Sequence, residues 1–94
     1  MPFDTATLID LCRTHNVAMI GVFGSVARGD AGDESDVDLL VRFKQPQSLL
    51  KLVAIERQFA DALGTSVDLV TEQSLHPYLR DNVLRDLQVL YEAK

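Results

Sequence analysis

The sequence predicts an α/β (α+β) protein, with a mixed sheet of three or four strands and helices packed on it. Short apolar runs rich in β-branched residues alternate along the chain with segments whose apolar residues recur at helical spacing. Strands that alternate with helices favour such a sheet over a helical bundle or a β-sandwich. The chain has 94 residues, of which 47% are hydrophobic and 24% charged, so we expect one globular domain over residues 1–94.

The first helix and the first strand occupy residues 4–23. Asp4 is a favourable N-cap for a helix that ends near His15, and Asn16 suits the turn that follows. Residues 17–23 are apolar, contain few helix formers and predict a buried strand. Gly21 lies within this strand and indicates that another backbone approaches it closely.

The second strand, residues 37–43, alternates between two kinds of side chain. One face is apolar and consists of Val37, Leu39, Val41 and Phe43. The other face carries Asp36, Asp38, Leu40 and Arg42. Because successive strand residues point to opposite faces, we expect the first set to pack on the core and the aspartates to lie on the other side.

A long helix and a third strand follow. Ser48 lies near the start of the helix, and Gly64 is a suitable C-terminal cap. The residues at helical spacing on the expected inner face are Leu49, Leu52, Val53, Glu56, Phe59, Ala60 and Leu63. Residues 67–71 predict a short strand.

The last segment predicts a helix and a fourth strand. Pro77 fits the first turn of a helix that ends near Arg85. Residues 87–91 favour a strand, although a helix is a close alternative. Leu50, Ile55 and Tyr78 widen the apolar faces of their helices, which indicates either further core or a surface for a partner.

The net charge of −5, from 9 Lys and Arg against 14 Asp and Glu, excludes one class of function. A protein that binds extended nucleic acid without sequence preference needs a broad basic surface, which this composition does not provide. Five of the acids lie within residues 30–38, which contain no Lys or Arg, so the rest of the chain is formally neutral. This local acidity is compatible with a nucleotide bound through a metal ion.

The composition also indicates a compartment. Cys12 is the only cysteine, which excludes an internal disulfide and a cysteine-only zinc site and suits a reducing environment. No apolar run approaches the ~18–20 residues of a membrane span. The N-terminal segment lacks the basic region of a signal peptide. We therefore expect a cytoplasmic protein without a membrane segment.

Three aspartates are candidate metal ligands. Asp36 and Asp38 are two residues apart on a strand, so they share a face with Cα atoms roughly 6.5 Å apart. Paired carboxylates at this spacing can hold one Mg²⁺ or bridge two ions. Asp68 lies within an apolar run, where a charge needs a partner unless it faces water at a strand edge.

The connectivity brings these residues together. The helix between Asp38 and Asp68 can act as a right-handed crossover, which places the third strand parallel to the second. The three aspartates then lie near the starts of parallel strands. Gly24 and Ser25 follow the first strand, so this strand must run antiparallel to the second to reach the same edge. We therefore expect both motifs to meet at one edge of a mixed sheet.

Gly24 and Ser25 supply what a phosphate group needs. Glycine allows close backbone approach, and a short helix that starts at Ser25 would direct free N–H groups at an anion. Ser25 alternatively acts only as a helix cap. Arg28 either contacts phosphate or braces the loop by pairing with Asp30 or another carboxylate. Carboxylates for metal beside a phosphate site are the arrangement for phosphoryl or nucleotidyl transfer.

The two segments together resemble a known signature. GSVARGD at residues 24–30 and SDVDLLV at residues 35–41 resemble the DNA polymerase beta-like nucleotidyltransferase superfamily, and the compact length resembles its minimal nucleotidyltransferase branch. The resemblance covers most of the chain and implies that superfamily's fold. It also implies that Asp36, Asp38 and Asp68 bind catalytic Mg²⁺, and that Gly24 and Ser25 hold the nucleotide phosphates.

The resemblance further implies a partner. Many minimal members are antitoxins paired with a helical HEPN-type toxin, a ribonuclease, and some transfer AMP from ATP to a tyrosine of the toxin. We therefore expect a Mg²⁺-dependent transferase, with two ions, that moves AMP from ATP to a hydroxyl of such a partner. A non-catalytic module that masks the toxin is an alternative. A small-molecule transferase, such as an antibiotic-modifying enzyme, is a second alternative, which the lack of a second domain disfavours.

Overall fold

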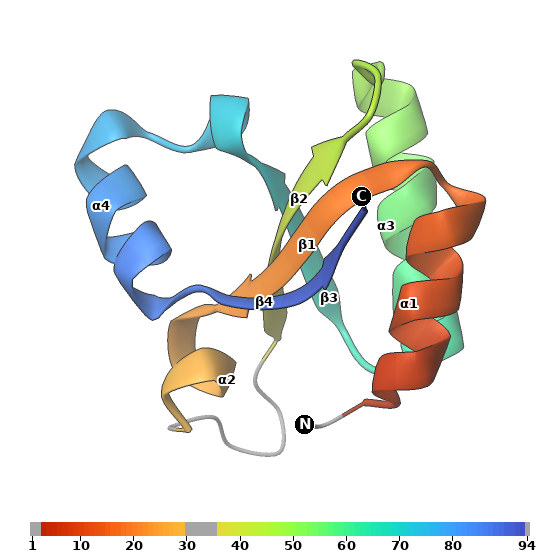
Figure 1. Ribbon diagram of the computed structural model, residues 1–94, viewed down its shortest axis with the longest axis horizontal. Helices are drawn as coiled ribbons and strands as arrows, with labels where there is room; N and C mark the ends of the chain where they lie inside the picture. Colours follow the sequence, from red (N-terminus) through yellow and green to blue (C-terminus); the bar gives the residue numbers. More distant parts are fainter. Residues whose placement is uncertain (1–2, 30–35, 94) are drawn as a thin grey trace.

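Strands and helices alternate in the computed structural model, which describes residues 3–29 and 36–93 (Figure 1). The elements in chain order are α1 (Thr5–Thr14), β1 (Val17–Phe23), α2 (Gly24–Arg28), β2 (Val37–Phe43), α3 (Leu49–Leu63), β3 (Val67–Thr71), the 3₁₀ helix η1 (Glu72–Ser74), α4 (Pro77–Asp86) and β4 (Gln88–Glu92). The element order agrees with the sequence prediction, and the last segment is a strand rather than a helix.

The strands form one mixed sheet in the order β3-β2-β1-β4. β1 pairs antiparallel with both β2 and β4, whereas β2 and β3 are parallel. α1 and α3 cover one face of this sheet and α4 lies over the other (Figure 1). The predicted mixed sheet is confirmed, and α3 is the crossover that makes β3 parallel to β2.

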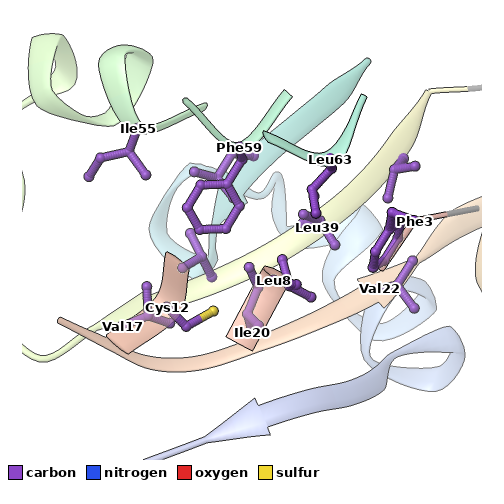
Figure 2. Packing of buried hydrophobic residues seen from close by; sticks show 13 residues of the cluster. Phe3, Leu8, Cys12, Val17, Ile20, Val22, Leu39, Ile55, Phe59 and Leu63 are labelled. Atoms are coloured by element: carbon purple, nitrogen blue, oxygen red, sulfur yellow. The ribbon is translucent and has the colours of Figure 1, made fainter. Parts of the chain in front are cut away.

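The main core fills the space between the sheet and the pair α1 and α3. Figure 2 shows Ile55, Phe59 and Leu63 of α3 pointing toward side chains of α1 and β1. The members of this core are Phe3, Leu8, Cys12, Val17, Ile20, Val22, Val37, Leu39, Val41, Ile55, Phe59, Leu63 and Leu69. The apolar face predicted for β2 is therefore the face that packs on this core.

The other face of the sheet carries a smaller apolar cluster. Met19 of β1, Leu40 of β2 and Val83 of α4 are all buried there. Val83 is the one α4 residue that is buried, so it is the apolar contact that holds this helix against the sheet. The position of α4 matters because the polar side chains of β2 point to the same face.

The ends of α3 are set by the predicted caps, but its inner face is rotated from the prediction. The Ser48 hydroxyl accepts the N–H of Lys51, and Gly64 closes the helix with a φ of 70°. The prediction that Leu49 and Val53 belong to the inner face is wrong, because they are 75% and 55% exposed. Ile55, which was expected only to widen the apolar face, is 1% exposed, since packing on the sheet selects the side of the helix that carries Ile55, Phe59 and Leu63.

A side chain of α3 also bonds to the sheet. Glu56 accepts the backbone N–H of Leu69 at 2.8 Å, in a partly buried position. Leu69 lies in the middle of β3, which is an edge strand. The carboxylate therefore satisfies a backbone donor of this edge strand. Among the described residues, no helix is long and apolar enough to cross a membrane.

Gly21 confirms the predicted close approach of another backbone. A Cβ atom at this position would lie 2.6 Å from Leu87 Cδ1 and 2.9 Å from the carbonyl oxygen of Gln88. Gly21 pairs with Val89 of β4, so the absence of a side chain lets β4 pass close to β1. The pairing of β4 with β1 therefore requires a residue without a side chain at position 21.

We predict that Gly21→Ala destabilises the protein by about 1–3 kcal/mol, because the added methyl group meets a backbone oxygen that cannot rotate away. Urea denaturation at equilibrium measures the change in the free energy of unfolding. The same substitution is also measured in a Leu87→Ala protein, in which the side-chain contact with Leu87 Cδ1 is removed and the contact with the Gln88 carbonyl oxygen remains. If Gly21→Ala is neutral in this background, the Gln88 backbone is not the obstacle.

We also predict that the thiol of Cys12 is unreactive in the folded protein. Burial raises the pKa of Cys12 to about 12, so thiolate is almost absent at neutral pH. Alkylation by iodoacetamide at pH 8 should be at least about 100-fold slower in the native state than in guanidinium chloride. Equal rates in the two conditions would show that the thiol is accessible.

Candidate functional site

The sheet register brings the predicted site residues to one edge. Phe23, the last residue of β1, pairs with Asp38 of β2. Asp38 in turn pairs with Asp68 of β3. Gly24 follows Phe23 directly, so the end of β1 and the starts of β2 and β3 meet there. The predicted convergence of the glycine motif with these two aspartates is confirmed.

Gly24 is required for two reasons. Its φ of 74° lies in the left-handed region that favours glycine. A Cβ atom at this position would also lie 2.5 Å from Oδ2 of Asp38. The chain therefore turns sharply from β1 into α2 while the Asp38 carboxylate rests against the backbone of the turn. Ser25 follows in α2, but its side chain lies outside the described part of the structure, and its phosphate contact stays a prediction.

Asp38 is half-buried, and its surroundings oppose its negative charge. Partial burial raises the pKa of this carboxyl above its usual value, and the charges of Asp68 and Asp36 raise it further. The charge of Arg28 acts in the opposite direction and lowers the pKa. A carboxylate in such surroundings is stabilised by a cation.

The three aspartates differ in exposure. Asp36 and Asp68 are both exposed, whereas Asp38 is half-buried. Within residues 3–29 and 36–93, no three His, Cys, Asp or Glu side chains already form a metal-binding group. The donor set nevertheless fits magnesium, because carboxylate oxygens are hard ligands and two of the three aspartates lie side by side in register. The assignment of Asp36, Asp38 and Asp68 as metal ligands stays a prediction.

A pocket of about 330 Å³ adjoins these residues. Gly24, Arg28, Asp38 and Asp68 all line it. Its remaining lining residues are Phe23, Val70, Leu75, Leu79, Asn82, Val83 and Asp86. Most of these belong to α4 and the segment before it, and the sequence analysis assigned none of them to the site. The spacing of Leu79, Val83 and Asp86 on one face of a helix is the only sequence signal for them.

Arg28 pairs with a residue far away in the sequence. Its Nη1 atom donates a hydrogen bond to Oδ2 of Asp86 at 2.8 Å. The alternative in which Arg28 pairs with another carboxylate is therefore confirmed. The pairing with Asp30 concerns a residue outside the described segments. Arg28 also lines the pocket beside Asp38, so contact with phosphate stays a prediction.

Comparison with known proteins decides the family. A sequence profile described as "Nucleotidyltransferase domain" matches residues 6–90. The chain belongs to this nucleotidyltransferase family. The resemblance seen in residues 24–30 and 35–41 is therefore confirmed, together with the enzyme class that it implied.

Curated and solved relatives agree with this family. The protein adenylyltransferase MntA of Thermococcus cleftensis is 43% identical over 83 residues, which cover 88% of this chain and 84% of that protein. A crystal structure described as a toxin-antitoxin with AMP-PNP has a TM-score of 0.84 at 25% identity, and covers 97% of this chain and 75% of that chain.

A third comparison supports the fold alone. It is a complex described as tri-AMPylated HEPN toxin of Shewanella oneidensis with its MNT antitoxin. The matched chain has a TM-score of 0.74 at 23% identity, and the match covers 95% of this nucleotidyltransferase and 70% of that chain. Together with the match that has a TM-score of 0.84 at 25% identity, it confirms the polymerase beta-like fold expected for the nucleotidyltransferase.

We predict that Asp38→Asn raises the thermal unfolding midpoint at neutral pH in the presence of EDTA by a few degrees. The folded-state pKa of Asp38 is raised, so its ionised form destabilises the fold at pH values above that pKa. The difference between variant and wild type should shrink as the pH falls and Asp38 becomes protonated. Differential scanning calorimetry measures the midpoints.

Asp61→Asn is the matched control, because Asp61 is an exposed residue of α3 on the other side of the sheet. It should leave the midpoint unchanged. A lower midpoint for Asp38→Asn than for this control would contradict the electrostatic explanation.

Proposed function

We propose that this nucleotidyltransferase is a protein adenylyltransferase that acts as an antitoxin. It transfers AMP from ATP to a hydroxyl of a HEPN-type toxin and requires Mg²⁺. The observation that carries the proposal is the register that places Gly24, Asp38 and Asp68 side by side at the mouth of one pocket. Such a site combines a phosphate-binding turn with carboxylate ligands at a single edge of the sheet.

Each site residue has a distinct task in this proposal. Asp36, Asp38 and Asp68 would hold two Mg²⁺ ions. When bound, magnesium neutralises negative charge on the phosphates and polarises the phosphorus that is attacked. Gly24 and Ser25 bind the phosphates that leave. Asp38 is held against the Gly24 backbone, so the metal site and the phosphate site are fixed relative to each other.

The transfer is a single displacement at the α-phosphorus of ATP. The acceptor oxygen forms a bond to this phosphorus while the bond to the β-phosphate oxygen breaks, and pyrophosphate leaves with the bonding electrons. The hydroxyl proton is lost in the same step. Asp68 is exposed on an edge strand beside the pocket, where its carboxylate can accept that proton from an incoming acceptor.

Two relatives support a protein acceptor. One is named a protein adenylyltransferase at 43% identity, and the other was crystallised as a toxin-antitoxin with AMP-PNP. The pocket of about 330 Å³ is also small for a nucleotide together with an acceptor, so the partner supplies part of the acceptor site. In this proposal the protein acts in the cytoplasm together with its toxin.

Labelled ATP tests the proposal directly. The protein is incubated with α-labelled ATP, Mg²⁺ and a HEPN-type protein. We expect label on the partner, and about 100-fold or more loss of labelling with the Asp36→Asn/Asp38→Asn variant, because both substitutions remove a charged ligand from the site. Chelation of Mg²⁺ by EDTA should abolish the labelling.

Asp61→Asn is again the control and should label the partner at the wild-type rate. If the double variant neutralises the toxin as well as the wild type does, and no label is transferred, the protein masks its partner without catalysis. Transfer of AMP to an aminoglycoside by the isolated protein, with none to the HEPN-type protein, would favour the hypothesis of a small-molecule nucleotidyltransferase.

A further inference from the structure

The Arg28–Asp86 ion pair joins two elements that are distant in the sequence. Arg28 is the last residue of α2 and Asp86 is the last residue of α4, and 58 positions separate them. The bond between Nη1 and Oδ2 is 2.8 Å, which is typical of a charge-assisted hydrogen bond. Asp86 is the less exposed partner, with a side-chain exposure of 26% against 51% for Arg28.

Asp86 is an unexpected residue at this place. It lines the same pocket as Asp38 and Asp68, so it adds a further carboxylate where the nucleotide phosphates are proposed to bind. A negative charge there repels phosphate unless a cation lies between them. Arg28 lines the pocket as well and bonds to this carboxylate, so the negative charge of Asp86 is paired with the positive charge of the guanidinium.

A second bond fixes the same end of α2. The side-chain amide of Gln88, the first residue of β4, donates to the carbonyl oxygen of Ala27 at 2.9 Å. The carbonyl groups in the last turn of a helix lack partners within the helix, so this bond satisfies one of them. α2 is thus also anchored through its backbone, by a bond to Gln88 in which Asp86 takes no part.

We propose that Asp86 is a positioning residue that holds the Arg28 guanidinium at the pocket, where it binds the phosphates of the incoming nucleotide; this inference rests on the proposed function. An arginine side chain has many rotamers, and ordering it at the moment of binding weakens affinity. The bond to Asp86 orders the side chain before the nucleotide arrives. Asp86 therefore acts through Arg28 and does not touch the substrate.

Nucleotide affinity is the property that this role controls. We expect Asp86→Ala to weaken the binding of Mg²⁺·AMP-PNP, measured by calorimetry, about tenfold, and to raise the KM for ATP in the transfer assay by a similar factor with little change in kcat. Asp86→Glu keeps the charge and should stay within about threefold of the wild type. Asp81→Ala removes an exposed carboxylate from the same helix and should bind like the wild type.

The exchange variant Arg28→Asp/Asp86→Arg separates positioning from simple stabilisation. It keeps an ion pair between α2 and α4 but moves the positive charge to the other helix. We expect it to recover the wild-type unfolding midpoint and to bind Mg²⁺·AMP-PNP at least as weakly as Asp86→Ala does. Recovery of binding by the exchange variant would mean that the pair only joins the two helices, and would overturn the proposal.

Two further outcomes are decisive. Wild-type affinity in Asp86→Ala, or tighter binding than the wild type, would show that Asp86 does not position Arg28. The binding measurement also stands apart from the proposed transfer reaction. If the wild type binds Mg²⁺·AMP-PNP but labels no partner, the function proposal fails, while the role of Asp86 is still decided by the affinities.

Discussion

The register of β2 is the constraint on which the site depends. Val37, Leu39, Leu40 and Val41 are almost completely buried, so the strand is packed on both faces. Because strand side chains alternate, a slip of one residue would turn Asp38 toward the core formed with α1 and α3. The same apolar residues that stabilise the sheet therefore fix the direction of Asp38, and the antiparallel and parallel neighbours of β2 bring the other site residues to it.

The sheet edge collects negative charge that the fold does not itself need. Asp38 is partly withdrawn from water beside Asp36 and Asp68, and each of these conditions disfavours its charge. A stable packed sheet can hold such groups in place although they repel one another, because the repulsion is small beside the burial of two apolar clusters. Arg28, which is bonded to Asp86 of α4, adds a positive group to the same pocket.

Local sequence signals predict most of this fold because alternation and capping act over a few residues. They also predict the carboxylate pair, since Asp36 and Asp38 lie two positions apart on one strand. The part of the pocket formed by α4 could not be predicted, because the packing of Val83 on the sheet is what brings Asp86 to the pocket. The rotation of α3 was mispredicted for a related reason. Its apolar residues permit several inner faces, and tertiary packing selects the one that contains Ile55.

The bond between Glu56 and the Leu69 N–H has a consequence beyond the single molecule. β3 is an edge strand, and the unpaired backbone groups of such a strand can recruit a strand from a second copy of the protein. Glu56 occupies one of these donors, and the charge of the exposed Asp68 lies next to it. The carboxylates of Glu56 and Asp68 thus disfavour the addition of a strand from another molecule at the open edge. Asp68 is also a proposed metal ligand. The exposed charge of Asp68 therefore has a second effect at the open edge, apart from its proposed role as a ligand.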